Sequence, residues 1–183
     1  MATKRDWLET GFDVLARDGA RALTIERLCG ELDLTKGSFY HHFKGMMGFK
    51  KDLLAHFEAE HTARFITAVE SSGGHARTKL RRLLDLVLDD KNDSVEIAVR
   101  SWALQDTDVR AVQERVDRTR IDYLRVLWRD LGGPESDVAP MSQLLYLILI
   151  GAQQVIPPVS APELRDIYKR ALRLVPHEEA DTP

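Results

Sequence analysis

The sequence predicts an all-α protein of about nine helices, with a three-helix N-terminal head and a longer helical body. Two observations predict this fold class. Apolar residues recur every three or four positions along most of the chain, which is the period of an amphipathic helix, whereas no segment alternates convincingly as a β-strand does. Gly, Pro and Asp residues interrupt this pattern where helices are expected to end. With 183 residues, 44% of them hydrophobic, the chain is long enough for a substantial core in one domain or two small ones.

The first two expected helices, residues 4–17 and 24–32, follow from their apolar positions and end signals. The apolar face of the first consists of Trp7, Leu8, Gly11, Phe12 and Leu15. It ends before Gly19, because Gly adopts left-handed backbone at little cost. The second opens at Thr24, a good N-cap, and has Glu26 in its first turn, where the helix dipole favours an acid.

The third expected helix, residues 35–43, completes a helix-turn-helix pattern. Asp33 stands in the turn, since Asp tolerates left-handed backbone better than most residues. Thr35 is an N-cap type. The apolar residues that can face inward together are Leu34, Phe39 and Phe43.

Six further helices are expected, over residues 49–71, 77–89, 94–105, 108–131, 141–156 and 162–175. A break is expected over Gly45–Gly48, before the first of them. The helix over 141–156 is apolar nearly all round, so it must be covered on two sides. It is expected to pair with 162–175 in a four-helix interface across a two-fold axis, and the alternative is a central helix of a monomer. A polar tail over 176–183 is expected to be flexible.

Composition limits the class of protein. The net charge of −3 excludes a bulk polycation, so an argument for DNA binding must depend on where the charges lie. The single Cys29 excludes an intramolecular disulfide, is typical of a reducing cytoplasm, and is expected to be a buried inert thiol, with a redox switch as the alternative. The charged N-terminus is unlike a secretory signal, and the longest apolar run, 144–150, is too short for a bilayer. We therefore expect a cytoplasmic protein without membrane association.

The segment from Leu34 to Lys51 contains no acid, although the chain has 29 of them, and this favours a surface that meets DNA. A recognition helix places its N-terminal residues at base edges, where Lys36 can donate to guanine and Gly37 lets the backbone approach. Hydroxyl groups can donate to phosphates. The candidate DNA-binding residues are Thr24, Thr35, Lys36, Gly37, Ser38, Tyr40, His41 and Lys44.

Each candidate also has a plainer interpretation. Tyr40 could be a half-buried core residue, and Lys36 and Lys44 could belong to an ordinary solvated face. His41 and His42 are adjacent, so their side chains point about 100° apart on a helix and do not chelate a metal together easily. We expect no metal site and no cofactor.

Residues 4–55 closely resemble the DNA-binding head of the TetR/AcrR family of bacterial transcriptional regulators. The residues that carry the resemblance are Gly19, Thr24, Ile25, Leu28, the run 34–44 and Leu53-Leu54. Asp33 departs from the family's usual Gly, and the stretch 45–48 is looser than the typical lead into the fourth helix. The rest of the chain resembles the family only in the number and length of its helices.

The resemblance implies a homodimeric, ligand-responsive regulator, a repressor that binds a pseudo-palindromic operator in double-stranded DNA. It also implies a helix-turn-helix domain over 1–48 and an effector-sensing and dimerisation domain over 49–175. Large side chains in the body are mostly core, but some are expected to line a pocket for a small-molecule effector. The candidates are Phe65, Trp102, Tyr123, Trp128 and Tyr146.

Two other functions are alternatives to a transcriptional regulator. An enzyme is disfavoured, because no nucleophile–base arrangement, glycine-rich phosphate loop or metal signature is present in the sequence. The other rival is a helical interaction module whose helix-turn-helix meets protein rather than DNA.

Overall fold

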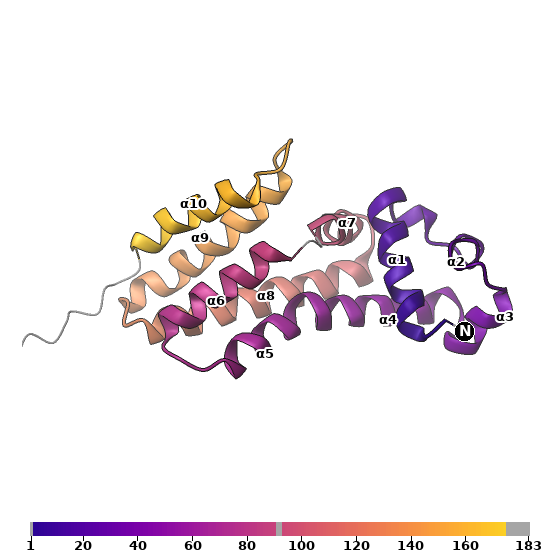
Figure 1. The fold of residues 1–183 in the computed structure, drawn as a ribbon, viewed down its shortest axis with the longest axis horizontal. Helices are drawn as coiled ribbons and strands as arrows, with labels where there is room; N and C mark the ends of the chain where they lie inside the picture. The colour runs from indigo at the N-terminus through magenta and orange to yellow at the C-terminus, as the bar shows by residue number, and fades with distance from the viewer. Residues whose placement is uncertain (1, 91–92, 175–183) are drawn as a thin grey trace, which may run out of the picture. The chain divides into compact units, whose positions relative to one another are not determined.

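The computed structural model describes residues 2–90 and 93–174, and within these ranges all regular structure is helical (Figure 1). The helices are α1 (Lys4–Asp18), α2 (Ile25–Leu32), α3 (Lys36–His42), α4 (Gly45–Glu58), α5 (Arg64–Ser71), α6 (Ala76–Asp89), α7 (Asp93–Ala103), α8 (Thr107–Asp130), α9 (Glu135–Gln154) and α10 (Ala161–Ala171). A π-helical turn, Ala59–Ala63, joins α4 to α5, so these ten α-helices of the described residues form nine continuous segments. The predicted all-α fold class is confirmed.

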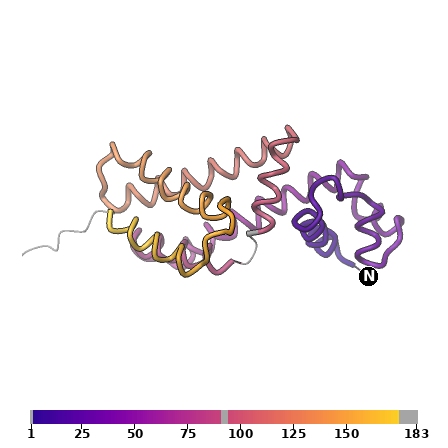
Figure 2. Tube along the Cα trace, turned by 90° about the horizontal axis from the view of Figure 1, so that it is seen from above, coloured from indigo at the N-terminus to yellow at the C-terminus, as the bar shows by residue number. Residues whose placement is uncertain are grey.

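The chain divides into two compact units. The first contains Met1–His61 and Asn92–Arg115, and therefore α1 to α4, α7 and the beginning of α8. The second contains Thr62–Lys91 and Val116–Pro183, and therefore α5, α6, α9, α10 and most of α8. The predicted domain boundary after residue 48 lies inside α4, which Figure 2 traces as one continuous coil. The division into a DNA-binding and an effector-sensing domain stays a prediction.

Aromatic side chains form the centre of the first unit. The indole of Trp7 meets the Phe39 ring edge-on, with ring centroids 5.5 Å apart. Phe39 of α3 and Phe43, the C-cap residue of α3, both contact Phe49 of α4, at 5.8 and 5.0 Å between centroids. All four side chains are buried, so the inner face of α3 packs against α1 and α4.

Helix α4 corrects the expected break over Gly45–Gly48, because it begins at Gly45, four residues earlier than predicted. Gly45 has φ +75°, a value that favours glycine, so the turn uses this one residue and the helix continues directly. Gly48 lies within the helix and costs about 1 kcal/mol relative to Ala. Burial of the following Phe49 offsets this cost.

Helix α9 also begins earlier than predicted, at Glu135 rather than 141, and passes through Pro140. Val138 in this first part is almost fully buried, at 2% exposure. The hydroxyl of Ser142 donates to the Val138 carbonyl at 2.6 Å. Burial of Val138 and this hydrogen bond stabilise a start that the proline alone disfavours.

The second unit has its own apolar core. It is built from Leu80, Leu124, Leu127, Trp128, Val138, Leu145, Tyr146, Ala152, Leu164, Tyr168 and Ala171. The Tyr168 hydroxyl donates to the Leu145 carbonyl at 2.9 Å, so α10 is joined to α9 by a buried hydrogen bond as well as by packing. The opposite side of α9 is different, because Leu144 and Leu147 expose 38% and 54% of their surface. The expected tail, 176–183, lies outside the described residues.

Helices in the described part of the chain are nowhere both long and apolar enough to cross a membrane.

Candidate nucleic-acid interface

The turn between α2 and α3 has the local geometry that the sequence predicts. Thr24 and Thr35 are the N-caps of α2 and α3, and the hydroxyl oxygen of Thr24 accepts from the Arg27 amide at 3.1 Å. Asp33 has left-handed backbone, with φ 53° and ψ 46°. The Leu34 amide then donates to the Cys29 carbonyl at 2.9 Å. These contacts fix the two helices of the motif relative to each other.

All eight predicted DNA-binding residues lie at the surface of this motif. Ser38 is half-buried, and the exposed members are Thr24, Thr35, Lys36, Gly37, Tyr40, His41 and Lys44. Tyr40 is 58% exposed, so the alternative of a half-buried core tyrosine is wrong. The structure therefore gives α3 an apolar inner face and a polar outer face, while contact with DNA stays a prediction.

The capping threonines keep hydrogen-bonding capacity for a ligand. The Thr24 oxygen uses a lone pair to cap α2, and that of Thr35 accepts from the Ser38 amide at 3.4 Å. A hydroxyl has one donor in addition to two lone pairs. Each exposed threonine can therefore cap its helix and donate to a phosphate oxygen at the same time.

Sequence reasoning missed Glu26. Its carboxylate accepts a hydrogen bond from the ammonium of Lys36, so an acid from α2 reaches the stretch 34–51, which has none of its own. This bond lowers the pKa of Glu26 and raises the pKa of Lys36, so both groups stay charged at neutral pH. The signal in the sequence was an acid two residues after Thr24, but its position in the first turn of the helix indicated only a favourable interaction with the helix dipole.

Two other basic groups near the N-terminus form ion pairs with acids of the first unit. Lys50, part of the acid-free stretch, donates to both Asp106 oxygens, at 2.7 and 2.8 Å, and to Asp108 at 2.9 Å. Lys4 begins α1 and pairs with Asp52 at 2.7 Å. The ammonium groups of Lys50 and Lys4 therefore form ion pairs within the protein.

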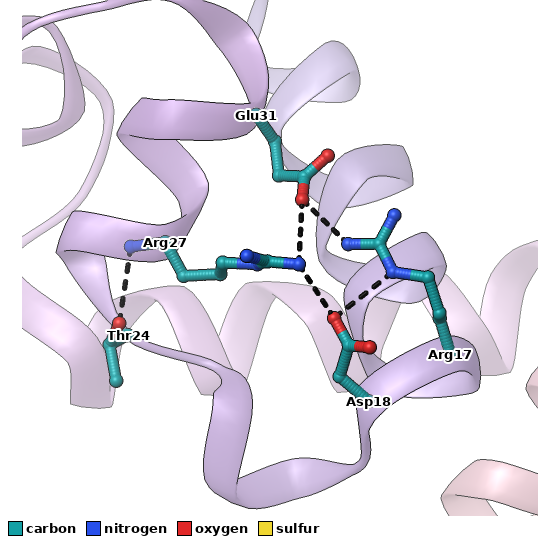
Figure 3. Close-up of polar contacts among 5 residues, drawn as sticks. All are labelled: Arg17, Asp18, Thr24, Arg27 and Glu31. Carbon is teal, nitrogen blue, oxygen red and sulfur yellow. Dashed lines mark hydrogen bonds and ion pairs between the residues drawn. The ribbon is translucent and has the colours of Figure 1, made fainter.

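A four-residue ion-pair network, formed by Arg17, Asp18, Arg27 and Glu31, links α1 to α2 (Figure 3). One guanidinium nitrogen of Arg27 lies 2.9 Å from Asp18 and 3.1 Å from Glu31. Arg17 reaches the same two carboxylates, at 3.0 and 2.6 Å. Because each acid has two basic partners, the network orients α2 without placing an uncompensated negative charge at the motif.

Among the predicted effector-binding residues, Tyr146 has the most polar surroundings. Its hydroxyl donates to Asp117 at 2.7 Å and accepts from Arg120, 3.4 Å away. Arg120 also donates to Thr62 at 3.0 Å. Tyr146 and Thr62 are buried, whereas Asp117 and Arg120 are half-buried, so the group connects buried hydroxyl groups to partly exposed charges of the second unit.

The other four candidates have different surroundings. Trp128 belongs to the core of the second unit, and Tyr123 packs against that core and donates to Glu70 at 2.6 Å. Phe65 is buried on α5, beneath the guanidinium of Arg64 at 4.9 Å. Trp102 lies in the first unit, where it lines an open hollow of about 630 Å³. Whether any of the five contacts an effector stays a prediction.

Cys29 lies on the inner side of α2, at 8% exposure. Burial raises the pKa of its thiol, and the nearby Glu26 adds to the effect. A thiol with a raised pKa is a poor nucleophile at neutral pH, which favours the interpretation of an inert side chain.

The fold and the motif define the structural class of this protein. Its regular structure, as far as it is described, is helical, and its N-terminal unit contains a helix-turn-helix. Residues 8–54 match the family described as "Bacterial regulatory proteins, tetR family". The resemblance to the TetR/AcrR family that the sequence predicts is thereby confirmed, and the chain has the fold of TetR-family DNA-binding transcriptional regulators. No curated protein sequence matches the chain.

Solved structures extend the likeness to the whole chain. Reduced NemR of E. coli is 18% identical, with a TM-score of 0.80 over 97% of this chain and all of its own. SCO4454, a TetR-family regulator of Streptomyces coelicolor, is 17% identical, with a TM-score of 0.75 over 94% and 89%. A regulator of Saccharomonospora viridis in complex with choline is 19% identical, with a TM-score of 0.74 over 93% and 95%. At these identities the likeness shows the fold alone.

Proposed function

We propose that this protein is a ligand-responsive transcriptional repressor that binds a pseudo-palindromic operator as a homodimer and is released by a small molecule. The main support for the proposal is the polar outer face of α3, where Lys36 and Tyr40 are exposed while Phe39 packs inward; Lys44, just after the helix, is exposed as well. A helix held in this way can enter the major groove and present its first residues to base edges.

Pairing of two copies supports the same function. One recognition helix of seven residues reads few base pairs, whereas two helices related by a two-fold axis read two half-sites, roughly 34–36 Å apart. Exposed apolar side chains on α9 and α10, namely Leu144, Leu147 and Ile167, provide a face for a second copy. Such a face is costly in water and gains stability when covered.

The effector would bind in the second unit, near Tyr146. Its hydroxyl, the carboxylate of Asp117 and the guanidinium of Arg120 are polar groups that can orient a ligand among apolar neighbours. Choline is bound by the S. viridis protein, but the chemical class of this chain's effector stays open. We expect no catalytic activity and a cytoplasmic location.

Selection of bound duplexes from a random pool tests the proposal. We expect an inverted repeat with half-sites one helical turn or a multiple of one turn apart, and a dimer in sedimentation measurements. A bound pool without a shared sequence, from a protein that remains folded, would favour the alternative of a helical protein-interaction module.

A further inference from the structure

The ion pair between Glu26 and Lys36 lies on the surface that the proposed function assigns to DNA. Lys36 is the first residue of α3, and Glu26 is the second residue of α2. The Lys36 ammonium donates to Glu26 Oε1, with 58% of the lysine side chain and 67% of the glutamate side chain exposed. Because both groups are in solvent, the pair adds little to folding stability and can open at little cost.

The two acids of α2 differ in how their charge is balanced. Glu31 shares Arg17 and Arg27 with Asp18, so its carboxylate belongs to the network between α1 and α2. Among the described residues, Glu26 pairs with Lys36, a candidate DNA contact. When Lys36 turns to DNA, the Glu26 carboxylate therefore loses its partner.

Glu26 is also close in sequence to a candidate phosphate contact. Thr24, two residues earlier, caps α2 and is exposed. Because the Glu26 carboxylate also bonds to the ammonium of Lys36, it would lie close to phosphates that Lys36 contacts, and like charges repel there. No acid of the stretch 34–51 shares this role, because that stretch has none.

We propose that Glu26 restrains Lys36 and thereby determines the sequence specificity of DNA binding. The Glu26 carboxylate competes with the phosphates of non-specific DNA for the Lys36 ammonium, and the ion pair opens only at the correct base. This inference rests on the proposed function, because it requires that α3 contacts DNA. On a random duplex, Lys36 exchanges one anionic partner for another and leaves Glu26 exposed to phosphates. On a matching site, guanine O6 and N7 offer Lys36 two acceptors that replace the carboxylate.

The restraint predicts how Glu26→Gln changes DNA binding. Affinity for a random 20–30 base-pair duplex is expected to rise several-fold at low salt, because roughly one more phosphate is neutralised. The slope of log K against log salt then steepens by up to about 0.9. Affinity for the selected operator rises less, so the ratio of specific to non-specific affinity falls.

Two further variants separate the restraint from a general charge effect. Glu114→Gln makes the same chemical change at an exposed position of α8 within the first unit, and is expected to leave both affinities within about twofold of wild type. In a Lys36→Ala background, the gain from Glu26→Gln is expected to be smaller than in the wild-type background, because only the direct repulsion between Glu26 and the phosphates remains to be removed. Circular dichroism melts of all variants check that α2 remains folded.

Fluorescence anisotropy titrations with random and selected duplexes decide between the outcomes. Equal effects of Glu26→Gln and Glu114→Gln, or an undiminished gain without Lys36, would overturn the restraint. Weaker operator binding by Glu26→Gln would also overturn it, since Glu26 would then act as a base contact that accepts from cytosine. A wild-type protein without salt-sensitive binding to any duplex would overturn the proposed function itself, which is a distinguishable failure.

Discussion

The ammonium group of Lys50 donates to both carboxylate oxygens of Asp106, which joins α4 to the turn before α8. Asp106 simultaneously accepts from the amides of Asp108 and Val109, at 3.0 and 3.2 Å, and so caps α8. Lys50 also lies over the ring of Trp102, 5.8 Å from its centroid. One lysine thus connects three elements of the first unit.

Replacement of Lys50 by Met is expected to destabilise the first unit by about 1–3 kcal/mol, because it leaves the partly buried Asp106 without its cation. Met keeps most of the apolar stem. Urea denaturation followed by circular dichroism measures the loss, and Lys51→Met at the exposed neighbouring position is the control. Equal stability of the two variants would contradict a structural role for Lys50.

Stability is expected to fall in acid. The hydrogen bond from Lys50 holds the pKa of Asp106 below its ordinary value of 3.8, and Lys79 and Tyr123 lower that of Glu70 below 4.5. A carboxyl whose pKa is lower in the folded state stabilises the protein above its unfolded pKa and loses this effect as pH falls through its folded pKa. The free energy of unfolding should therefore decrease as pH falls below about 5.

Asp106→Asn isolates one part of this acid sensitivity, because Asn is also a good N-cap but has no charge. Urea denaturation at pH 7 and pH 4 should show a smaller acid loss in the variant than in wild type. An identical loss would mean that Asp106 has the same pKa in the folded and unfolded chains.

Gly11 is expected to tolerate no side chain, because a β-carbon there would lie 2.6 Å from Cζ of Phe49. Gly11→Ala should cost about 1–3 kcal/mol through overpacking between α1 and α4. Gly30→Ala is the matched control, since nothing lies within 4 Å of its β-carbon. This change within α2 should stabilise by about 0.5–1 kcal/mol, so thermal melts should move in opposite directions.

Cys29 should react slowly with a thiol reagent at pH 7. Burial raises its pKa above the ordinary value of 9.0, so the thiolate fraction is small and the sulfur is shielded as well. The rate with iodoacetamide should increase many-fold in urea. Fast reaction of the native protein would restore the alternative of a redox switch.

Local features of the head could be predicted from the sequence because they depend on a few adjacent residues. Thr24 and Thr35 cap their helices through amides three residues away. Asp33 adopts the left-handed turn that its short polar side chain permits. Phe39 and Phe43 face inward because the helical period puts them on one side.

Tertiary partners could not be predicted, because they come from distant positions. Lys50 meets Asp106, 56 residues further along the chain, and Lys36 meets an acid on the preceding helix. An acid-free stretch of sequence is therefore not an acid-free surface. The early starts of α4 and α9 were missed for a related reason, since burial of Phe49 and Val138 outweighs local glycine and proline signals.

A salt titration of binding to the DNA that flanks the protein's own gene, with wild type and a Lys36→Ala/Tyr40→Phe variant, tests whether α3 reads DNA. If α3 is a recognition helix, wild type binds with sequence preference, weakens steeply as salt increases, and loses this binding in the variant. Binding that is weak, indifferent to sequence and unchanged in the variant would mean that α3 is not a recognition helix.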